Sequence, residues 1–297
     1  MSSKPLLYAL LTVAALAAVG ALYFYLQPAA EEIATPTPII EEVVVEPELV
    51  RNERIIGKSV EGRDISAVTF GDGATHLLFV GGIHGGYEWN SSLLAYELID
   101  HIASTTDFLP ADLTLTIIPD LNPDGTALVT GVDGRFTATD IADPSTRVPE
   151  GRFNANDVDL NRNFACKWAP ESTWRGEVVS AGTAAFSEPE AAALRDFVLS
   201  TQPETVVFWH SQAGNVYASE CEDGILPETL TLMSTYAKAA GYGEVPKFDA
   251  YPITGDAEGW LASVGIPAVT VELERFNSIE WTRNLAGVEA VLTEFVK

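Results

Sequence analysis

The chain has 297 residues, of which 47% are hydrophobic and 20% are charged. This composition excludes a disordered or fibrous chain and supplies enough apolar material for a large globular domain. Lys and Arg number 17 against 42 Asp and Glu, which gives a net charge of −25. Because such a protein repels the phosphate backbone of nucleic acid, we expect no nucleic acid partner.

The N-terminus carries an uncharged stretch from Pro5 to Leu26, preceded by Lys4. As a helix, this stretch would span the roughly 30 Å of bilayer hydrocarbon, so residues 1–29 are predicted to form a transmembrane anchor with the rest outside the cytoplasm. A cleaved signal peptide is the alternative and would give a secreted protein, although its apolar core is usually only about 7–15 residues long. Residues 30–50 are rich in Glu and Pro and predict an extended acidic stalk.

Residues 51–297 predict one catalytic domain, because no repeat or second linker interrupts them. Apolar, β-branched runs alternate with stretches of helical period, a pattern typical of a mostly parallel sheet with helices on both faces. We therefore expect an α/β fold of three layers (α/β/α) around a twisted, mixed sheet. The expected strands are residues 65–70, 76–81, 113–119, 205–209 and 268–273, and the expected helices are residues 91–104, 188–199, 227–240 and 282–296. Ser187 and Glu190 predict a capping box before the second helix.

The chain contains only two cysteines, Cys166 and Cys221. They cannot provide a four-cysteine zinc or iron–sulfur site, so any metal must be held by histidine and carboxylate. Outside the cytoplasm the two could form a disulfide, and two separate buried thiols are equally compatible with the sequence.

Two of the four histidines, His84 and His210, lie where predicted strands end. Ligands of α/β proteins gather at the carboxyl ends of the strands. His84 stands in a glycine-rich segment that also contains Glu88. Either histidine alone would be interpreted as an ordinary core or loop residue, but a His, Glu, His set leaves zinc one open position for water.

Several motifs in the domain occur in a characteristic order. Asp159–Phe164 reads Asp-Leu-Asn-Arg-Asn-Phe, and Phe186–Glu190 reads Phe-Ser-Glu-Pro-Glu. Three further segments accompany them at residues 56–63, 117–125 and 269–273. With these motifs, nearly all of residues 55–295 resembles the zinc carboxypeptidase family, in its bacterial type near the murein tripeptide amidase-like members.

The resemblance implies a catalytic role for five residues. His84, Glu88 and His210 would hold one Zn²⁺, which polarises the scissile carbonyl and activates a water molecule. Glu272 would accept the proton of that water and return it to the leaving amine. Arg152 would neutralise the developing oxyanion.

Four further residues would bind substrate if the resemblance holds. Asn161 and Arg162 would clamp the terminal carboxylate, and Tyr251 would close over the bound end. Glu258 corresponds to the floor of the specificity pocket, with Asp256 close by, which indicates a preference for cationic C-terminal side chains. Solvated carboxylates in an acidic chain are the alternative interpretation.

One motif departs from the family pattern, since Glu88 follows His84 by four positions rather than the usual three. A glycine-rich loop can absorb the extra residue without turning Glu88 away. The predicted function is an extracytoplasmic, monomeric zinc carboxypeptidase that acts on peptides or cell-wall stem peptides. The alternatives are a zinc amidase or deacylase of the murein tripeptide amidase type, and a non-catalytic peptide receptor on the same scaffold.

Overall fold

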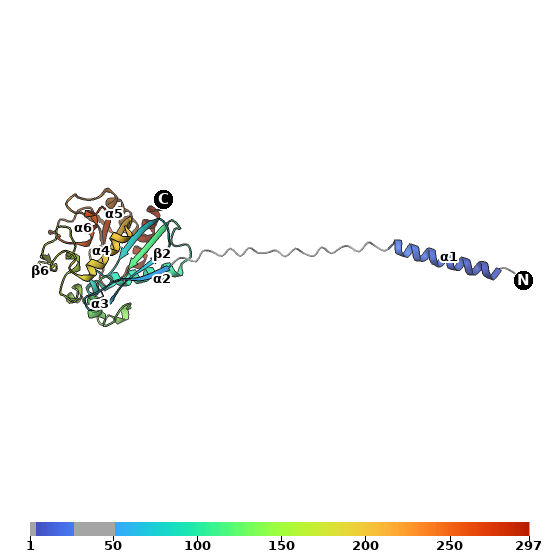
Figure 1. The fold of residues 1–297 in the computed structure, drawn as a ribbon, viewed down its shortest axis with the longest axis horizontal. Helices are drawn as coiled ribbons and strands as arrows, with labels where there is room; N and C mark the ends of the chain where they lie inside the picture. The colour runs from blue at the N-terminus through green and yellow to red at the C-terminus, as the bar shows by residue number, and fades with distance from the viewer. Residues whose placement is uncertain (1–3, 27–50, 297) are drawn as a thin grey trace. The chain divides into compact units, whose positions relative to one another are not determined.

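The computed structural model describes residues 4–26 and 51–296, and the chain divides into one unit of residues 1–47 and another of residues 48–297 (Figure 1). In the first unit the predicted helix forms as α1, Lys4–Tyr25. Within the described part of the chain, no helix is both long and apolar enough to cross a membrane. The predicted stalk, residues 30–50, lies outside the described residues.

The second unit is built on a mixed sheet of eight strands in the order β1-β2-β4-β3-β7-β10-β8-β9. The four central strands β4, β3, β7 and β10 run parallel. The strand β2 pairs antiparallel with both β1 and β4, and β8 pairs antiparallel with β10 but parallel with β9. In chain order these strands are β1 (Arg51–Lys58), β2 (Asp64–Phe70), β3 (Thr75–Val80), β4 (Leu113–Ile118), β7 (Thr205–Ser211), β8 (Asn215–Ala218), β9 (Gly243–Val245) and β10 (Ala268–Leu273). A separate hairpin consists of β5, Glu171–Trp174, and β6, Glu177–Ser180.

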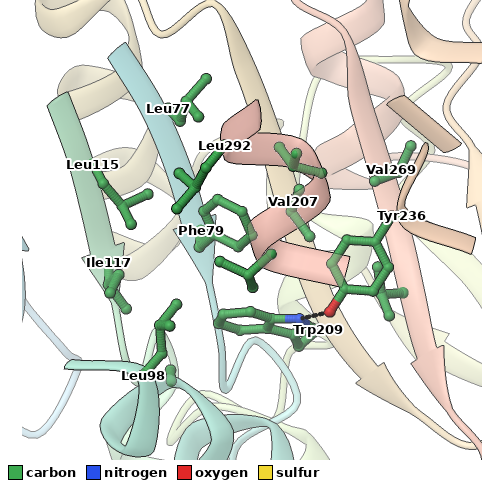
Figure 2. Packing of buried hydrophobic residues seen from close by; sticks show 14 of the residues in the cluster. Leu77, Phe79, Leu98, Leu115, Ile117, Val207, Trp209, Tyr236, Val269 and Leu292 are labelled. Atoms are coloured by element: carbon green, nitrogen blue, oxygen red, sulfur yellow. Dashed lines mark hydrogen bonds between the residues drawn. The ribbon is translucent and has the colours of Figure 1, made fainter. Parts of the chain in front are cut away.

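Helices cover both faces of this sheet, as the sequence predicts. One face is packed against α2 (Trp89–Ser104), α5 (Pro227–Ala240) and α7 (Trp281–Glu294), and the other against α4 (Pro189–Thr201) and α6 (Ala257–Ser263). Figure 2 shows the first of these cores, where the rings of Phe79 and Trp209 lie 5.2 Å apart and the Trp209 indole donates a hydrogen bond to the Tyr236 hydroxyl. The three-layer α/β/α fold is therefore confirmed.

All five expected strands and all four expected helices of the domain are present, with ends that differ by at most two residues. The first strand, β1, was not among the expected strands, and the sequence did not predict the short elements β5, β6, β8, β9, α6 and α3, Pro123–Thr130. The predicted capping box is wrong, because the N-cap of α4 is Glu188. The Glu190 carboxylate instead accepts hydrogen bonds from the Val60 amide and the Asn154 side chain.

The glycine-rich segment after β3 is a tight turn that only glycine permits. Gly82 and Gly85 have φ angles of +66° and +44°. A Cβ atom at Gly85 would lie 2.8 Å from the carbonyl oxygen of Gly151. Residues Gly85–Glu88 then form a single 3₁₀ turn, which takes up the extra residue between His84 and Glu88 before α2 begins.

Cys166 and Cys221 form a disulfide in the folded domain. The bond joins the segment that follows Arg162 to the loop that precedes α5. A disulfide constrains the unfolded chain and so stabilises the fold. The open choice between a disulfide and two thiols is thereby resolved in favour of the disulfide.

Asp120, directly after β4, generates a prediction about stability. Its side chain is buried, and its Oδ1 has no hydrogen-bond partner among the described residues. Burial raises the pKa of Asp120 from 3.8 to about 7, so between these values the folded protein binds more protons than the unfolded chain. The unfolding free energy therefore falls as the pH rises from 4 to 7, by up to about 4 kcal/mol from this residue.

In Asp120→Asn, which cannot ionise, this part of the pH dependence should disappear. Urea unfolding of both metal-free proteins at pH 4, 5.5 and 7 measures the difference. If the two stability curves run parallel over this range, Asp120 ionises in the fold as easily as in the unfolded chain.

Candidate metal centre and active site

Three side chains from different parts of the chain meet at the carboxyl end of the central strands. His84 lies in the turn after β3, Glu88 at the N-cap of α2 and His210 near the end of β7, and all three are buried. One ligand atom from each lies within 4.8 Å of the others. His210 Nδ1 is 3.3 Å from Glu88 Oε2, so the three predicted ligands face one common point.

The chemistry of these three side chains fits a zinc ion. Burial lowers the pKa of His84 well below its usual range, which keeps the ring neutral and able to coordinate. Its Nδ1 is buried without a hydrogen-bond partner in the described part of the chain. Two imidazoles and one carboxylate are a usual donor set for catalytic zinc, with the fourth position left for water.

Glu258 lies directly behind His210. Its Oε1 is 3.1 Å from His210 Nε2 and accepts a hydrogen bond from the Thr270 hydroxyl at 2.9 Å. Burial alone would lower the pKa of His210, but the hydrogen bonds of Glu258 and Glu88 outweigh it and raise the pKa to about 10. A carboxylate on the second nitrogen of a ligating histidine orients the ring and increases its basicity.

Arg152 is held against the metal centre by a buried ion pair. Its Nε and Nη2 donate to Asp159 Oδ2 at 2.9 and 2.8 Å, and its Nη1 lies 3.9 Å from Glu88 Oε1. The guanidinium also stacks over the ring of Trp174 at 4.7 Å. Arg152 is thus fixed on both sides, with one nitrogen turned towards the predicted ligand Glu88.

Glu272 is the carboxylate with the fewest partners in this region. It pairs with His210 across the β10–β7 ladder, and its Oε2 is buried with no hydrogen-bond partner among the described residues. Burial, followed by the negative charge of Glu88, raises the pKa of Glu272 to about 7. A carboxylate with such a pKa can accept and release a proton near neutral pH.

All nine predicted site residues line one cavity of about 740 Å³. Asn161 and Arg162 reach it from a short 3₁₀ turn, Leu160–Arg162, where Asn161 Oδ1 accepts a hydrogen bond from the Ala257 amide. Arg162 is buried, and its Nε has no partner within the described residues. Tyr251 is exposed and packs against Phe248, so it stands at the mouth of the cavity.

Two residues that hold other side chains of this site in place were given no role by the sequence analysis. Asp159 belongs to the motif Asp159–Phe164, and the structure places it in an ion pair with Arg152. Arg147 lies in no motif, yet its guanidinium donates to the carbonyl and hydroxyl oxygens of Ser211, the residue after His210. Only the fold brings Arg147 to the cavity.

A model of one protein family, described as zinc carboxypeptidase, matches residues 40–276. The chain belongs to the zinc carboxypeptidase family. Members of this family use one zinc ion, and His84, Glu88 and His210 fit such an ion.

Curated relatives are about one quarter identical to this chain over the aligned residues. Gamma-D-glutamyl-L-diamino acid endopeptidase 1 of Lysinibacillus sphaericus is 25% identical over 240 residues, covering 73% of this chain and 59% of that protein. Carboxypeptidase B of Helicoverpa zea is 26% identical over 254 residues, covering 76% and 57%. The chain therefore spans less than two thirds of the length of these relatives.

Solved structures with the same fold include both peptidases and an amidase. The murein-tripeptide amidase of Escherichia coli O157 has a TM-score of 0.60 at 22% identity, covering 91% of this chain and 98% of that one. Bovine thrombin-activatable fibrinolysis inhibitor has a TM-score of 0.64 at 19% identity, covering 82% and 90%. At these identities the likeness establishes the fold.

The position of Glu258 predicts an effect on metal binding. We expect Glu258→Gln to weaken zinc binding about 10- to 100-fold, because a neutral amide supports the basicity of His210 less well than a carboxylate. Competition with a chromogenic chelator measures the zinc affinity. Glu220→Gln is the matched control, since Glu220 lines the same cavity but forms its ion pair with Lys247. An unchanged affinity in Glu258→Gln would contradict the supporting role and leave Glu258 free to bind substrate.

Proposed function

We propose that this protein is an exported zinc carboxypeptidase that hydrolyses the C-terminal bond of peptides or cell-wall stem peptides. The observation that carries the proposal is one cavity that contains a three-residue metal site, a fixed guanidinium and a carboxylate with no hydrogen-bond partner on Oε2 among the described residues. The Cys166–Cys221 disulfide supports export, because disulfides persist mainly in oxidising compartments. Attachment to a membrane through residues 1–29 stays a prediction of the sequence.

The residues of the cavity divide the chemistry among them. When bound, zinc polarises the scissile carbonyl and makes a water molecule more acidic. Glu272 accepts the proton at its carboxylate and later delivers it to the leaving amine. Arg152, held in place by Asp159, donates to the carbonyl oxygen as negative charge develops there.

The C-terminal residue of the substrate, which hydrolysis releases, would lie beside Asn161 and Arg162. The C-terminal carboxylate would accept from Asn161 and Arg162, for which Arg162 offers a buried Nε that has no other partner among the described residues. Tyr251 would cover the bound residue from the mouth of the cavity. A fixed guanidinium and amide pair binds a carboxylate with defined geometry, which places the last peptide bond over the metal centre.

A preference for cationic C-terminal residues is the finer part of the proposal. Asp256 and Glu258 line the cavity, and burial together with the charge of Glu258 raises the pKa of Asp256 to about 6. Each carboxylate also has a protein partner, since Asp256 accepts from the Gly259 amide and Glu258 from His210. A lysine ammonium would therefore share these carboxylates rather than replace a partner.

Matched peptides that end in lysine or leucine test this preference. We expect release of lysine to be about tenfold faster, because two buried carboxylates attract the ammonium group. Measurement of kcat/KM for the two peptides, with a glutamate-ended peptide as the opposite-charge control, gives the comparison. Equal rates for lysine and leucine would remove the preference and leave the peptidase assignment intact.

An amidase that cleaves a γ-linked bond is the second candidate. The resemblance to a protein named gamma-D-glutamyl-L-diamino acid endopeptidase and the shared fold with a murein-tripeptide amidase favour it. Mass spectrometry of products from α-linked and γ-linked substrates of equal composition separates the two activities. The non-catalytic receptor is disfavoured because pure binding needs neither Glu272 nor Arg152.

Replacement of the proposed general base tests the mechanism. We expect Glu272→Gln to lower kcat by about 10²- to 10⁴-fold while one zinc per chain remains bound, since Glu272 is not a predicted ligand. Metal analysis of the purified protein accompanies the rate measurement. Glu274→Gln, an exposed change two residues further along the chain, is the matched control and should keep full turnover. Unimpaired turnover in Glu272→Gln would exclude this mechanism.

A further inference from the structure

Positive charge is scarce in this chain but gathers around the cavity. Against 42 acidic residues the chain has 17 basic ones, and five of these line the cavity: Arg147, Arg152, Arg162, Lys167 and Arg175. Arg152 has its ion pair with Asp159. The other four have no carboxylate within 4.0 Å in the described part of the chain, although the protein is strongly acidic. Cations that stay unpaired under these conditions indicate an anionic ligand.

Arg147 and Arg175 converge on one phenol oxygen. Arg147 Nη1 donates to the Tyr87 hydroxyl at 3.0 Å, and Arg175 Nη1 donates to the same oxygen at 3.3 Å. Two guanidinium groups that share one neutral acceptor repel each other, and this repulsion is relieved when an anion binds between them. Arg147 Nε, moreover, is buried with no partner among the described residues.

Aromatic rings, rather than carboxylates, hold these two arginines in place. Arg147 lies over the rings of Tyr87 and Phe276, at 4.5 and 5.0 Å from their centroids, and Arg175 lies over Trp174 at 5.8 Å. Trp174 in turn packs edge-on against Tyr87 at 5.1 Å. This support keeps the guanidinium groups oriented while leaving their charge available to a ligand.

Arg175 also occupies an unusual backbone position. It is the first central residue of the two-residue turn between β5 and β6, with φ of +54°. Asn, Asp or Gly is usual in such a turn, because other side chains are strained there. The strained conformation places Arg175 against Tyr87 at the cavity.

The pair and Arg162 are anchored to different elements around the metal centre. Arg147 Nη2 donates a hydrogen bond to Ser211, which directly follows the predicted ligand His210. Tyr87, the shared acceptor of the two arginines, directly precedes the predicted ligand Glu88. Asn161, the neighbour of Arg162, is bonded instead to Ala257 at the start of α6. If the leaving residue places its terminal carboxylate at Arg162, the acyl side of the scissile bond faces Arg147 and Arg175.

We propose that Arg147 and Arg175 form a second carboxylate-binding site, which selects substrates with an acidic group on the acyl side of the scissile bond. The inference rests on the proposed hydrolytic function and names its substrate class. Two chemical sources offer such a carboxylate: the side chain of an α-linked acidic residue, and the free α-carboxylate of a γ-linked glutamyl residue. Both would accept bidentate hydrogen bonds from the guanidinium groups.

Two matched pairs of substrates test the proposal on the zinc-loaded protein. The first pair has Glu or Gln immediately before the cleaved α-linked bond, and the second has a γ-linked glutamyl residue with a free or an amidated α-carboxylate. We expect kcat/KM to be at least tenfold higher for the acidic member of one pair, mainly through a lower KM. The pair that shows the effect identifies the source, and no difference in either pair overturns the proposal.

Variants then assign the selectivity to these residues. Arg175→Gln, a change at an exposed turn residue, should reduce the ratio of kcat/KM for the acidic member to that for the neutral member about tenfold. Arg147→Lys should weaken the preference because bidentate bonding is lost. Lys167→Gln removes one positive charge from the same cavity without touching Tyr87 and should retain the preference. An equal loss of preference in Lys167→Gln would contradict a specific site and indicate general electrostatic attraction.

Failure of the proposed function remains distinguishable from failure of this inference. If none of the four substrates is cleaved, calorimetric binding of the same compounds to the zinc-loaded protein measures the preference directly. Tighter binding of the acidic members, lost in Arg175→Gln, supports the carboxylate site even without turnover. Equal binding of acidic and neutral members overturns the site whether or not hydrolysis occurs.

Discussion

The site depends on the parallel pairing of β3, β7 and β10 at the centre of the sheet. Val80 pairs with Phe208 across β3 and β7, so the chain that leaves β3 delivers His84 beside His210. The β10 ladder places Glu272 opposite His210. Residues that are distant in sequence therefore meet at one edge of the sheet, and a slip of one residue in this register would turn Glu272 or His210 to the opposite face.

The buried charged groups at this edge of the sheet influence one another. Glu88, Glu258 and Glu272 are all buried around His210, and Arg152 is bound by Asp159 rather than free to balance them. Buried carboxylates without compensation are costly, which is why the pKa of Glu272 rises towards neutrality. A divalent cation held by His84, Glu88 and His210 would add positive charge beside these carboxylates.

The sequence predicted what local pattern and motif determine, and missed what depends on distant contacts. The central strands are apolar runs, so their positions and the fold class could be predicted, and the motifs led to nine side chains that share one cavity. The short strands β8 and β9 carry no such pattern. Glu190 was expected to cap its own helix, yet its carboxylate bonds to the distant Val60 amide. Neither the contact of Glu258 with His210 nor the convergence of Arg147 and Arg175 has a local signal.

The distribution of charge links the fold to the choice of substrate. A protein with net charge −25 repels anionic peptides at long range, but at physiological salt this repulsion is screened beyond about 8 Å. Inside the cavity the nearest charges dominate, and there Arg147, Arg162 and Arg175 face the ligand without carboxylate partners among the described residues. The overall negative charge therefore slows the approach of an anionic substrate, while the arginines that line the cavity attract the substrate once it has entered. This attraction favours a substrate whose carboxylates contact both Arg162 and the pair of Arg147 and Arg175.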